Sequence, residues 1–110
     1  MITLEAASRG LSTRERLMVK LRASEINQCQ FCINMHSKEA RDKGIDVTPT
    51  NEREELIVAF TEMGTRLDET FEDAMIDRAV ELLGEKTTGE LIATIATINA
   101  WNRIGRLSRK

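Results

Sequence analysis

Three patterns in which Ser, Asn or Thr precedes Glu by three positions divide this chain into helical segments. They are Ser12 with Glu15, Asn51 with Glu54, and Thr87 with Glu90. In such a capping box, each side chain accepts a hydrogen bond from a backbone N–H group that the first helical turn leaves unpaired. We therefore expect helices to begin close to these three pairs.

Apolar residues follow each expected start at intervals of three or four, which is the helical period. We expect helices over residues 14–25 and 29–43, and a third that starts at the Asn51–Glu54 pair and has its apolar stripe over residues 56–67. A fourth starts at Asp68 or Thr70 and ends at Gly84, and a fifth covers about 88–106. A second glycine, Gly44, stands where a helix C-cap belongs. No segment alternates apolar and polar residues as a strand does. The sequence predicts an all-α fold of about five helices, with residues 1–110 as a single domain.

Composition excludes several classes of function. The net charge of −2 gives no basic footprint for nucleic acid, and the 4% aromatic content gives no row of rings on which bases could stack. No apolar run is long enough to span a bilayer, and residues 1–14 lack the apolar centre of a signal peptide. Two cysteines are too few for a secreted disulfide scaffold. We expect a cytoplasmic protein without a nucleic-acid or membrane partner.

The last expected helix carries apolar residues over much of its circumference. They are Leu91, Ile92, Ile95, Ala96, Ile98, Trp101 and Ile104. A helix that is apolar on so many sides needs cover on more than one of them. In a chain of 110 residues, a second subunit is an expected source of that cover.

The residues that carry chemistry lie in the segment 25–36. Cys29, Cys32 and His36 fall at i, i+3 and i+7 and share one helix face. A helix N-terminus or a nearby imidazolium favours the reactive thiolate form of cysteine, and two thiols at this spacing can close a disulfide. Glu25 would lie one turn before Cys29 if the helix continued through Asn27, and its carboxylate could then relay a proton. These four residues are the candidate catalytic group.

Three other interpretations of the same residues stay open. The cysteines could be small buried hydrophobic residues of the core. Cys29, Cys32 and His36 could supply three zinc ligands, with Glu25 or a second chain as the fourth. A thioredoxin-like motif would need strands around it, and none is expected here.

Residues 19–44 contain Cys-x-x-Cys-x-x-x-His followed by Ser-Lys-Glu-Ala-Arg, and residues 95–104 read Ile-Ala-Thr-Ile-Asn-Ala-Trp-Asn-Arg-Ile. In these segments the sequence resembles the AhpD-like alkylhydroperoxidase branch of the carboxymuconolactone decarboxylase family. The resemblance implies trimers or hexamers, a hydroperoxide substrate, a dithiol reductant such as a lipoyl group, and no bound cofactor or metal. It also implies that Cys32 attacks the peroxide, Cys29 resolves the product and His36 belongs to the proton relay.

The chain departs from that family's pattern at two positions. Many relatives have a relay glutamate twelve residues before the first cysteine, where this chain has Leu17, and a glycine directly before that cysteine, where it has Gln28. Either Glu25 replaces the missing carboxylate or the relay is weakened. We expect Gln28 to make the helix more continuous than a glycine would.

The sequence thus predicts a thiol-dependent peroxidase that uses Cys32, Cys29, His36 and Glu25. One alternative is a lactone decarboxylase-type lyase that uses His36 and Glu25 as acid and base. Another is a non-enzymatic helical protein whose cysteine pair senses redox state.

Overall fold

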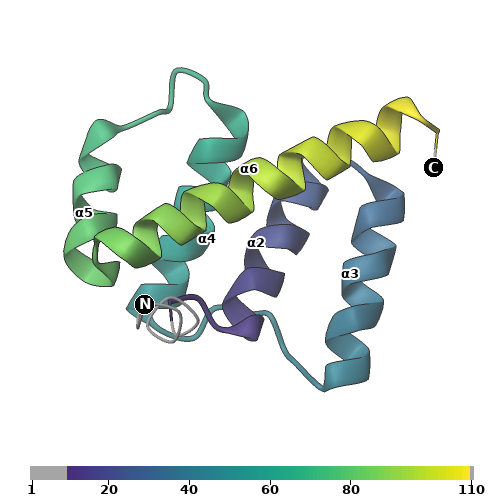
Figure 1. The fold of residues 1–110 in the computed structure, drawn as a ribbon, viewed down its shortest axis with the longest axis horizontal. Helices are drawn as coiled ribbons and strands as arrows, with labels where there is room; N and C mark the ends of the chain where they lie inside the picture. The colour runs from purple at the N-terminus through teal and green to yellow at the C-terminus, as the bar shows by residue number, and fades with distance from the viewer. Residues whose placement is uncertain (1–9, 110) are drawn as a thin grey trace, which may run out of the picture.

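A computed structural model describes residues 10–109, and within that range every regular element is an α-helix (Figure 1). The helices are α2 (Thr13–Ile26), α3 (Gln30–Lys43), α4 (Glu52–Arg66), α5 (Asp73–Leu83) and α6 (Glu85–Leu107). The predicted all-α class is therefore confirmed.

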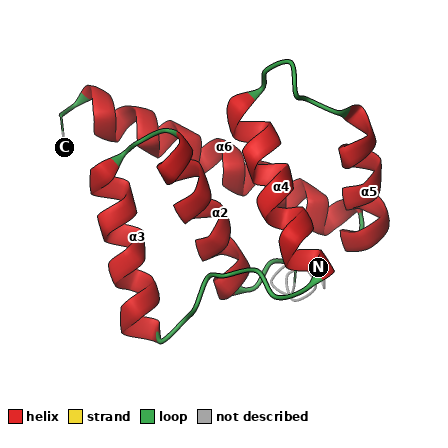
Figure 2. Ribbon diagram, turned by 180° about the vertical axis from the view of Figure 1, so that it is seen from behind, coloured by secondary structure: helices red, strands yellow, loops and turns green. Residues whose placement is uncertain are grey.

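The long helix α6 crosses the other four helices and contacts each of them. Seen from behind, α3, α2, α4 and α5 stand in a row in front of α6 (Figure 2). Helix α2 is central, because it packs against α3, α4 and α6. This arrangement brings the start of α3 beneath the C-terminal part of α6, where the cysteines lie.

The core is aliphatic and sits mainly between α2, α4 and α6. Its buried members are Leu11, Val19, Ala23, Leu56, Ile57, Phe60, Met63, Ala79, Leu91, Ile95 and Ile98. Full burial of one such large aliphatic side chain contributes about 1.5–3 kcal/mol. Leu91 and Ile57 are both fully buried, so α4 and α6 are held to each other by their apolar faces.

The first predicted capping box is present in full. The Ser12 hydroxyl accepts from the Glu15 N–H at 3.0 Å, and the Glu15 carboxylate accepts from the Ser12 N–H at 3.0 Å. The second is present by half: Asn51 accepts from the Glu54 N–H at 2.8 Å, but the Glu54 carboxylate accepts from Thr50 instead.

The third predicted capping box is wrong. Helix α6 begins at Glu85, directly after Gly84, so Thr87 is already inside the helix. The Glu90 carboxylate accepts from the backbone N–H of Leu11 at 3.0 Å and also pairs with Arg16. Glu90 thus joins α6 to the start of α2, and this long-range pairing replaces the local one.

The predicted start of the fourth helix at Asp68 or Thr70 is also wrong, since α5 begins at Asp73. The Asp68 carboxylate accepts from both the N–H and the hydroxyl of Thr70, at 2.9 and 2.5 Å. Such a local side-chain turn competes with helix formation. Leu67, expected in the apolar stripe of α4, instead ends that helix in a left-handed conformation and is 68% exposed.

The expected wide apolar surface of α6 is present and is partly uncovered. Ile92, Trp101 and Ile104 are each at least half exposed. They lie on different sides of the helix, so packing within the chain leaves more than one side open. Among residues 10–109, no helix combines the length and apolar character needed to cross a bilayer.

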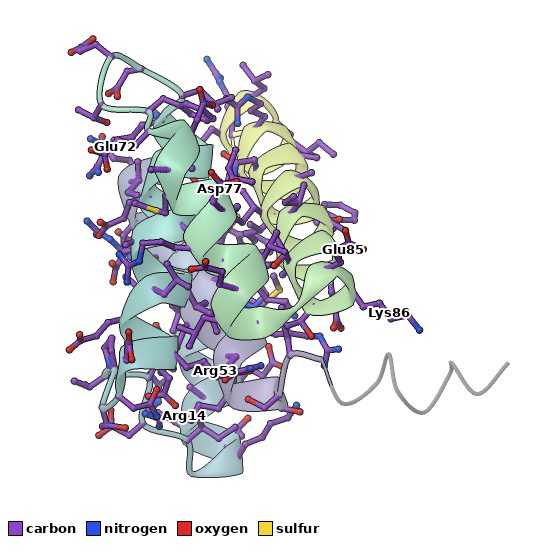
Figure 3. All side chains as sticks on the ribbon, turned by 90° about the vertical axis from the view of Figure 1, so that its left-hand side faces the viewer. Arg14, Arg53, Glu72, Asp77, Glu85 and Lys86 are labelled. Atoms are coloured by element: carbon purple, nitrogen blue, oxygen red, sulfur yellow. A yellow bond between two sulfur atoms is a disulfide. The ribbon has the colours of Figure 1, made fainter. Side chains whose placement is uncertain are left out.

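Two ion pairs hold α2 to α4 at one end of the bundle, where Figure 3 places Arg14 and Arg53. Arg14 donates to both Glu54 oxygens at 3.0 and 3.1 Å, and Arg53 donates to Glu15 at 2.7 Å. The bond from Arg14, supported by the Thr50 N–H, lowers the pKa of Glu54 to about 2. Glu54 thus favours the folded state in its ionised form.

This ion pair predicts a specific loss of stability in acid. The folded-state pKa of Glu54, about 2, lies below its ordinary value of 4.5, so its contribution is present above pH 4.5 and is lost as the pH falls toward 2. We expect Glu54→Gln to lower the free energy of unfolding at neutral pH and to flatten its decline over that acid window. Urea denaturation at a series of pH values measures both effects. The control is Glu55→Gln at the exposed neighbouring position, which should leave the pH profile unchanged. A Glu54→Gln profile with the wild-type slope would contradict the prediction.

Candidate active site

The two cysteines lie at the start of α3. Cys29 is its N-cap residue and Cys32 is in its first turn; their Cα atoms are 5.3 Å apart and their sulfur atoms lie at disulfide distance. The Cys29 sulfur also accepts a hydrogen bond from the Cys32 N–H at 3.4 Å. Since the N-terminal turn of a helix favours negative charge, this position stabilises a thiolate when the pair is reduced.

The chain reaches this position through a sharp turn, and the expectation of a more continuous helix is wrong. Helix α2 ends at Ile26, and Gln28 adopts a left-handed conformation with φ of 54°. The Gln28 N–H bonds to the Glu25 carbonyl at 3.1 Å, and the Cys29 N–H bonds to the Ser24 carbonyl at 3.0 Å. These two bonds form a Schellman motif, which requires a residue in the left-handed conformation, and Gln28 is that residue here.

The break in the helix also removes the basis on which Glu25 was placed beside Cys29. The Glu25 side chain is 52% exposed and pairs with Arg22 at 3.1 Å. Leu17, at the other position considered for a relay carboxylate, is buried and apolar. Neither position therefore supplies a carboxylate that bonds to the imidazole among the described contacts.

His36 lies one helical turn after Cys32 and is 9% exposed. Its Nδ1 atom is 3.3 Å from Glu39 Oε1, and Lys43 donates to Glu39 Oε2 at 3.1 Å. The bond from Lys43, followed by the contact with His36, lowers the pKa of Glu39. The sequence analysis missed Glu39, although a His-x-x-Glu spacing places two side chains together on any helix.

A pocket of about 600 Å³ opens beside His36, between α2, α3 and α6. Its wall is mostly apolar and includes Phe31, Met35 and Trp101, with Arg16, Lys20 and Glu90 as its charged members. The sulfur atoms do not line it, but the Trp101 carbonyl oxygen lies 4.0 Å from Cys32 Sγ. Trp101 thus contacts Cys32 through its backbone and also belongs to the wall of this pocket.

Helix α6 packs closely over the two sulfur atoms, and Gly105 makes this close approach possible. A Cβ atom at Gly105 would lie 2.8 Å from Cys29 Sγ and 3.3 Å from Cys32 Sγ. Cys29 and Cys32 are accordingly 1% and 2% exposed. The sequence analysis missed Gly105, although an isolated glycine inside a helical pattern is a sign of close packing.

A network of side-chain amides, centred on the buried Asn102, ties the turn before Cys29 to α6. Asn27 donates to Asn99 at 2.8 Å and to Asn102 at 3.0 Å. Asn102 is fully buried and donates to the Ser24 hydroxyl at 2.9 Å. Because a buried amide without partners costs about 1–3 kcal/mol, this network fixes the position of the turn relative to α6. It was not anticipated from the sequence.

The geometry bears on two of the alternative interpretations. Among residues 10–109, no three His, Cys, Asp or Glu side chains are grouped as ligands for a metal ion. The cysteine pair lies on a helix among helices, with no strand in the described part of the chain. This surrounding structure differs from that of a thioredoxin-like site.

The arrangement agrees with comparisons to known proteins. The profile of the carboxymuconolactone decarboxylase family matches residues 2–64. The chain belongs to this family. It is 31% identical to the uncharacterized protein YdfG of Bacillus subtilis, in an alignment that spans 84% of this chain and 71% of the relative.

A solved structure from Agrobacterium tumefaciens extends the family likeness to nearly the whole chain. That protein is described as one of unknown function and as a candidate antioxidant defence protein AhpD. The two structures superpose with a TM-score of 0.83 at 29% identity, over 99% of this chain and 85% of the other. The resemblance inferred from the sequence is therefore confirmed, and α6, which lies beyond the profile match, shares the family's fold.

The close approach of Gly105 to the sulfur atoms predicts that even one added methyl group is harmful there. We expect Gly105→Ala to destabilise the oxidised protein by about 1–3 kcal/mol, the usual cost of overpacking. The matched control is Gly89→Ala in the same helix, where a Cβ atom would meet nothing within 4 Å. We expect this variant to stabilise the protein by about 0.5–1 kcal/mol, because alanine favours a helix more than glycine does. Urea unfolding of both variants measures the difference, and equal effects would contradict the packing at Gly105.

Proposed function

We propose that this protein is a thiol-dependent peroxidase that reduces hydroperoxides through the Cys29–Cys32 pair. The observation that carries the proposal is the cysteine pair at disulfide distance in the first turn of α3, with His36 one turn farther along the same helix. Membership in the carboxymuconolactone decarboxylase family and the likeness to a candidate AhpD protein support it.

The proposed reaction has three steps. The Cys32 thiolate attacks one oxygen of the hydroperoxide, the O–O bond breaks, and Cys32 becomes a sulfenic acid while the alcohol leaves with a proton. The Cys29 thiolate then attacks the Cys32 sulfur, which forms the disulfide and releases the sulfenic oxygen as water. An external dithiol finally reduces the disulfide through a mixed disulfide and is itself oxidised. His36 acts as the group that delivers and accepts protons.

We assign the attacking role to Cys32 rather than Cys29 because of their surroundings. Cys32 is the cysteine one turn before His36, and its sulfur lies next to the Trp101 backbone, which borders the open pocket. Cys29 Sγ is the sulfur closer to α6, since a Cβ atom at Gly105 would lie 2.8 Å from it and 3.3 Å from Cys32 Sγ. The N-cap position of Cys29 favours its own thiolate, which suits a resolving residue that must attack in the second step.

The burial of both sulfur atoms places a requirement on turnover. A reductant must approach a disulfide sulfur to attack it, yet both cysteines are at most 2% exposed. Reduction therefore needs a local opening between the start of α3 and the C-terminal part of α6. A small dithiol or a lipoyl-type arm, as the family resemblance implies, fits such an opening better than a bulky protein disulfide partner would.

Serine substitutions test the proposed reaction. We expect Cys32→Ser to reduce the turnover of an organic hydroperoxide, supplied with a dithiol, to the uncatalysed background. Cys29→Ser should still consume about one equivalent of peroxide and then stop, because Cys32 can be oxidised but not resolved. Peroxide consumption and mass spectrometry of the Cys32 sulfur measure these outcomes.

The same variants separate the competing functions. Unchanged turnover in Cys32→Ser would end the peroxidase proposal. Lactone decarboxylation that survives loss of both thiols would favour a lyase that uses His36 and Glu25, and Glu25→Gln would then test the second residue. An oxidation-dependent change in oligomeric mass without peroxide consumption would favour a redox sensor.

We further propose that the protein acts as a homo-oligomer, a trimer or hexamer as the resemblance implies. Apolar side chains on α3 and α6 are about half exposed: Phe31 at 45%, Met35 at 46%, Trp101 at 58% and Ile104 at 52%. A second copy of the chain would remove this apolar surface from water, which is the main driving force for stable association.

Light scattering tests this proposal directly. We expect the wild-type protein to have a mass several times the 12.4 kDa of one chain. Ile104→Glu should lower that mass, because a charge would be buried in the contact. The control is Glu69→Lys in the exposed loop before α5. A wild-type mass of a single chain would contradict the proposal.

A further inference from the structure

We infer that Glu39 is a positioning residue that holds His36 in the tautomer with its proton on Nδ1, so that Nε2 is left as the basic nitrogen of the site. The catalytic consequence rests on the proposed function. The tautomer itself does not, since it follows from the contact between two side chains.

The contact is local and within hydrogen-bond distance. Glu39 Oε1 lies 3.3 Å from His36 Nδ1, one turn farther along α3. An ionised carboxylate can only accept hydrogen bonds, so the nitrogen that faces it must carry the hydrogen. In a neutral imidazole, Nε2 then has a free lone pair and can accept a proton. The hydrogen-bond partner of Nδ1 thus decides the role of Nε2.

Glu39 is itself held in place. Lys43, one further turn along, donates to Glu39 Oε2 at 3.1 Å, so the two carboxylate oxygens have different partners on the same helix. The Glu39 side chain is 32% exposed, and that of His36 is 11% exposed. The ion pair with Lys43 leaves Oε1 directed at the more buried imidazole.

Other charged groups near His36 come from the two neighbouring helices. Arg16 and Lys20 of α2 and Glu90 of α6 line the same pocket as His36. Arg16 is paired with Glu90, and Lys20 contributes positive charge at Glu39. Among the described residues, Glu39 is the acidic side chain that contacts the imidazole ring.

The position of Glu39 differs from the two positions considered for a relay carboxylate. Leu17 is buried and apolar, and the Glu25 carboxylate pairs with Arg22. A carboxylate on α3 itself, three residues after His36, can orient the ring without help from either position. Its place on the same helix also makes the geometry independent of how α2 and α3 are packed.

Nitrogen NMR tests the tautomer without measuring activity. His36 is the single histidine of the chain, so its two ring nitrogens give unambiguous signals. At about pH 9, where an imidazole is ordinarily neutral, we expect ¹⁵N spectra of the oxidised protein to show Nδ1 as the protonated nitrogen. Glu39→Ala should shift the signals toward the Nε2–H tautomer that free histidine side chains favour.

Two further variants make the test specific. Glu39→Gln should retain the wild-type tautomer, because its amide oxygen can still accept from Nδ1–H. Asp42→Ala, which removes a carboxylate that pairs with Lys38 on the exposed side of the same helix, should change nothing. An Nε2–H tautomer in the wild type, or Glu39→Ala spectra identical to it, would overturn the inference.

Activity measurements then address the catalytic consequence separately. If the protein is a peroxidase, Glu39→Ala should lower kcat and displace its pH profile, with a smaller effect on KM for the hydroperoxide. Glu39→Gln should restore much of the rate. A shifted tautomer with no peroxidase activity in any variant would uphold the role of Glu39 and refute the proposed function.

Discussion

The turn between α2 and α3 determines where every reactive group of this protein lies. Its two backbone bonds, from Gln28 to Glu25 and from Cys29 to Ser24, end one helix and direct the chain into the next. Without this reversal, Cys29 would continue along α2 and could not cap the start of α3. The cysteine pair thus depends on a left-handed backbone position at Gln28, a conformation that costs a residue with a Cβ atom about 1–2 kcal/mol.

That local cost is offset by contacts between the turn and α6. Asn27 and Ser24, which flank the end of α2, bond to Asn102 of α6, and Asn102 is fully buried. The same helix places Gly105 against the sulfur atoms. One stretch of α6 therefore fixes the turn through the hydrogen bonds of Asn102. The same stretch covers the disulfide, because Gly105 has no side chain to hold the two helices apart. The hydrogen bonds of Asn102 and the close approach of Gly105 both require α6 to be placed at one particular position along its axis relative to the turn.

The elements that could be predicted from the sequence are those with local causes. The Ser12–Glu15 box, the left-handed Gly44 and the helical spacing of Cys29, Cys32 and His36 all depend on residues within one or two turns of each other. Several of the failures have long-range causes. Glu90 was expected to cap its own helix but instead bonds to Leu11, 79 positions away in the chain. The partners of Asn102 and the close approach of Gly105 also become visible only when α6 is packed on α2 and α3.

Glu25 shows how one wrong local assumption changes the interpretation of a site. Its proposed place beside Cys29 assumed that the helix continued through Asn27, and the Schellman motif interrupts it there. Glu39 was not predicted as part of the site, because the one carboxylate proposed there, Glu25, precedes the cysteines in the sequence. Yet the same periodicity that aligned His36 with Cys32 also places Glu39 beside His36.

The location of these groups on α3 has a consequence for how the site can work. The cysteine pair, the imidazole and its carboxylate all lie between Cys29 and Lys43, so their mutual geometry is set by a single helix. The pocket wall and the cover over the sulfur atoms come instead from α2 and α6. A movement of α6 away from the start of α3 would expose the disulfide while leaving its relation to His36 unchanged. In the proposed reaction, access to the sulfur atoms would therefore depend on the contacts of α6, while proton transfer would depend on contacts within α3.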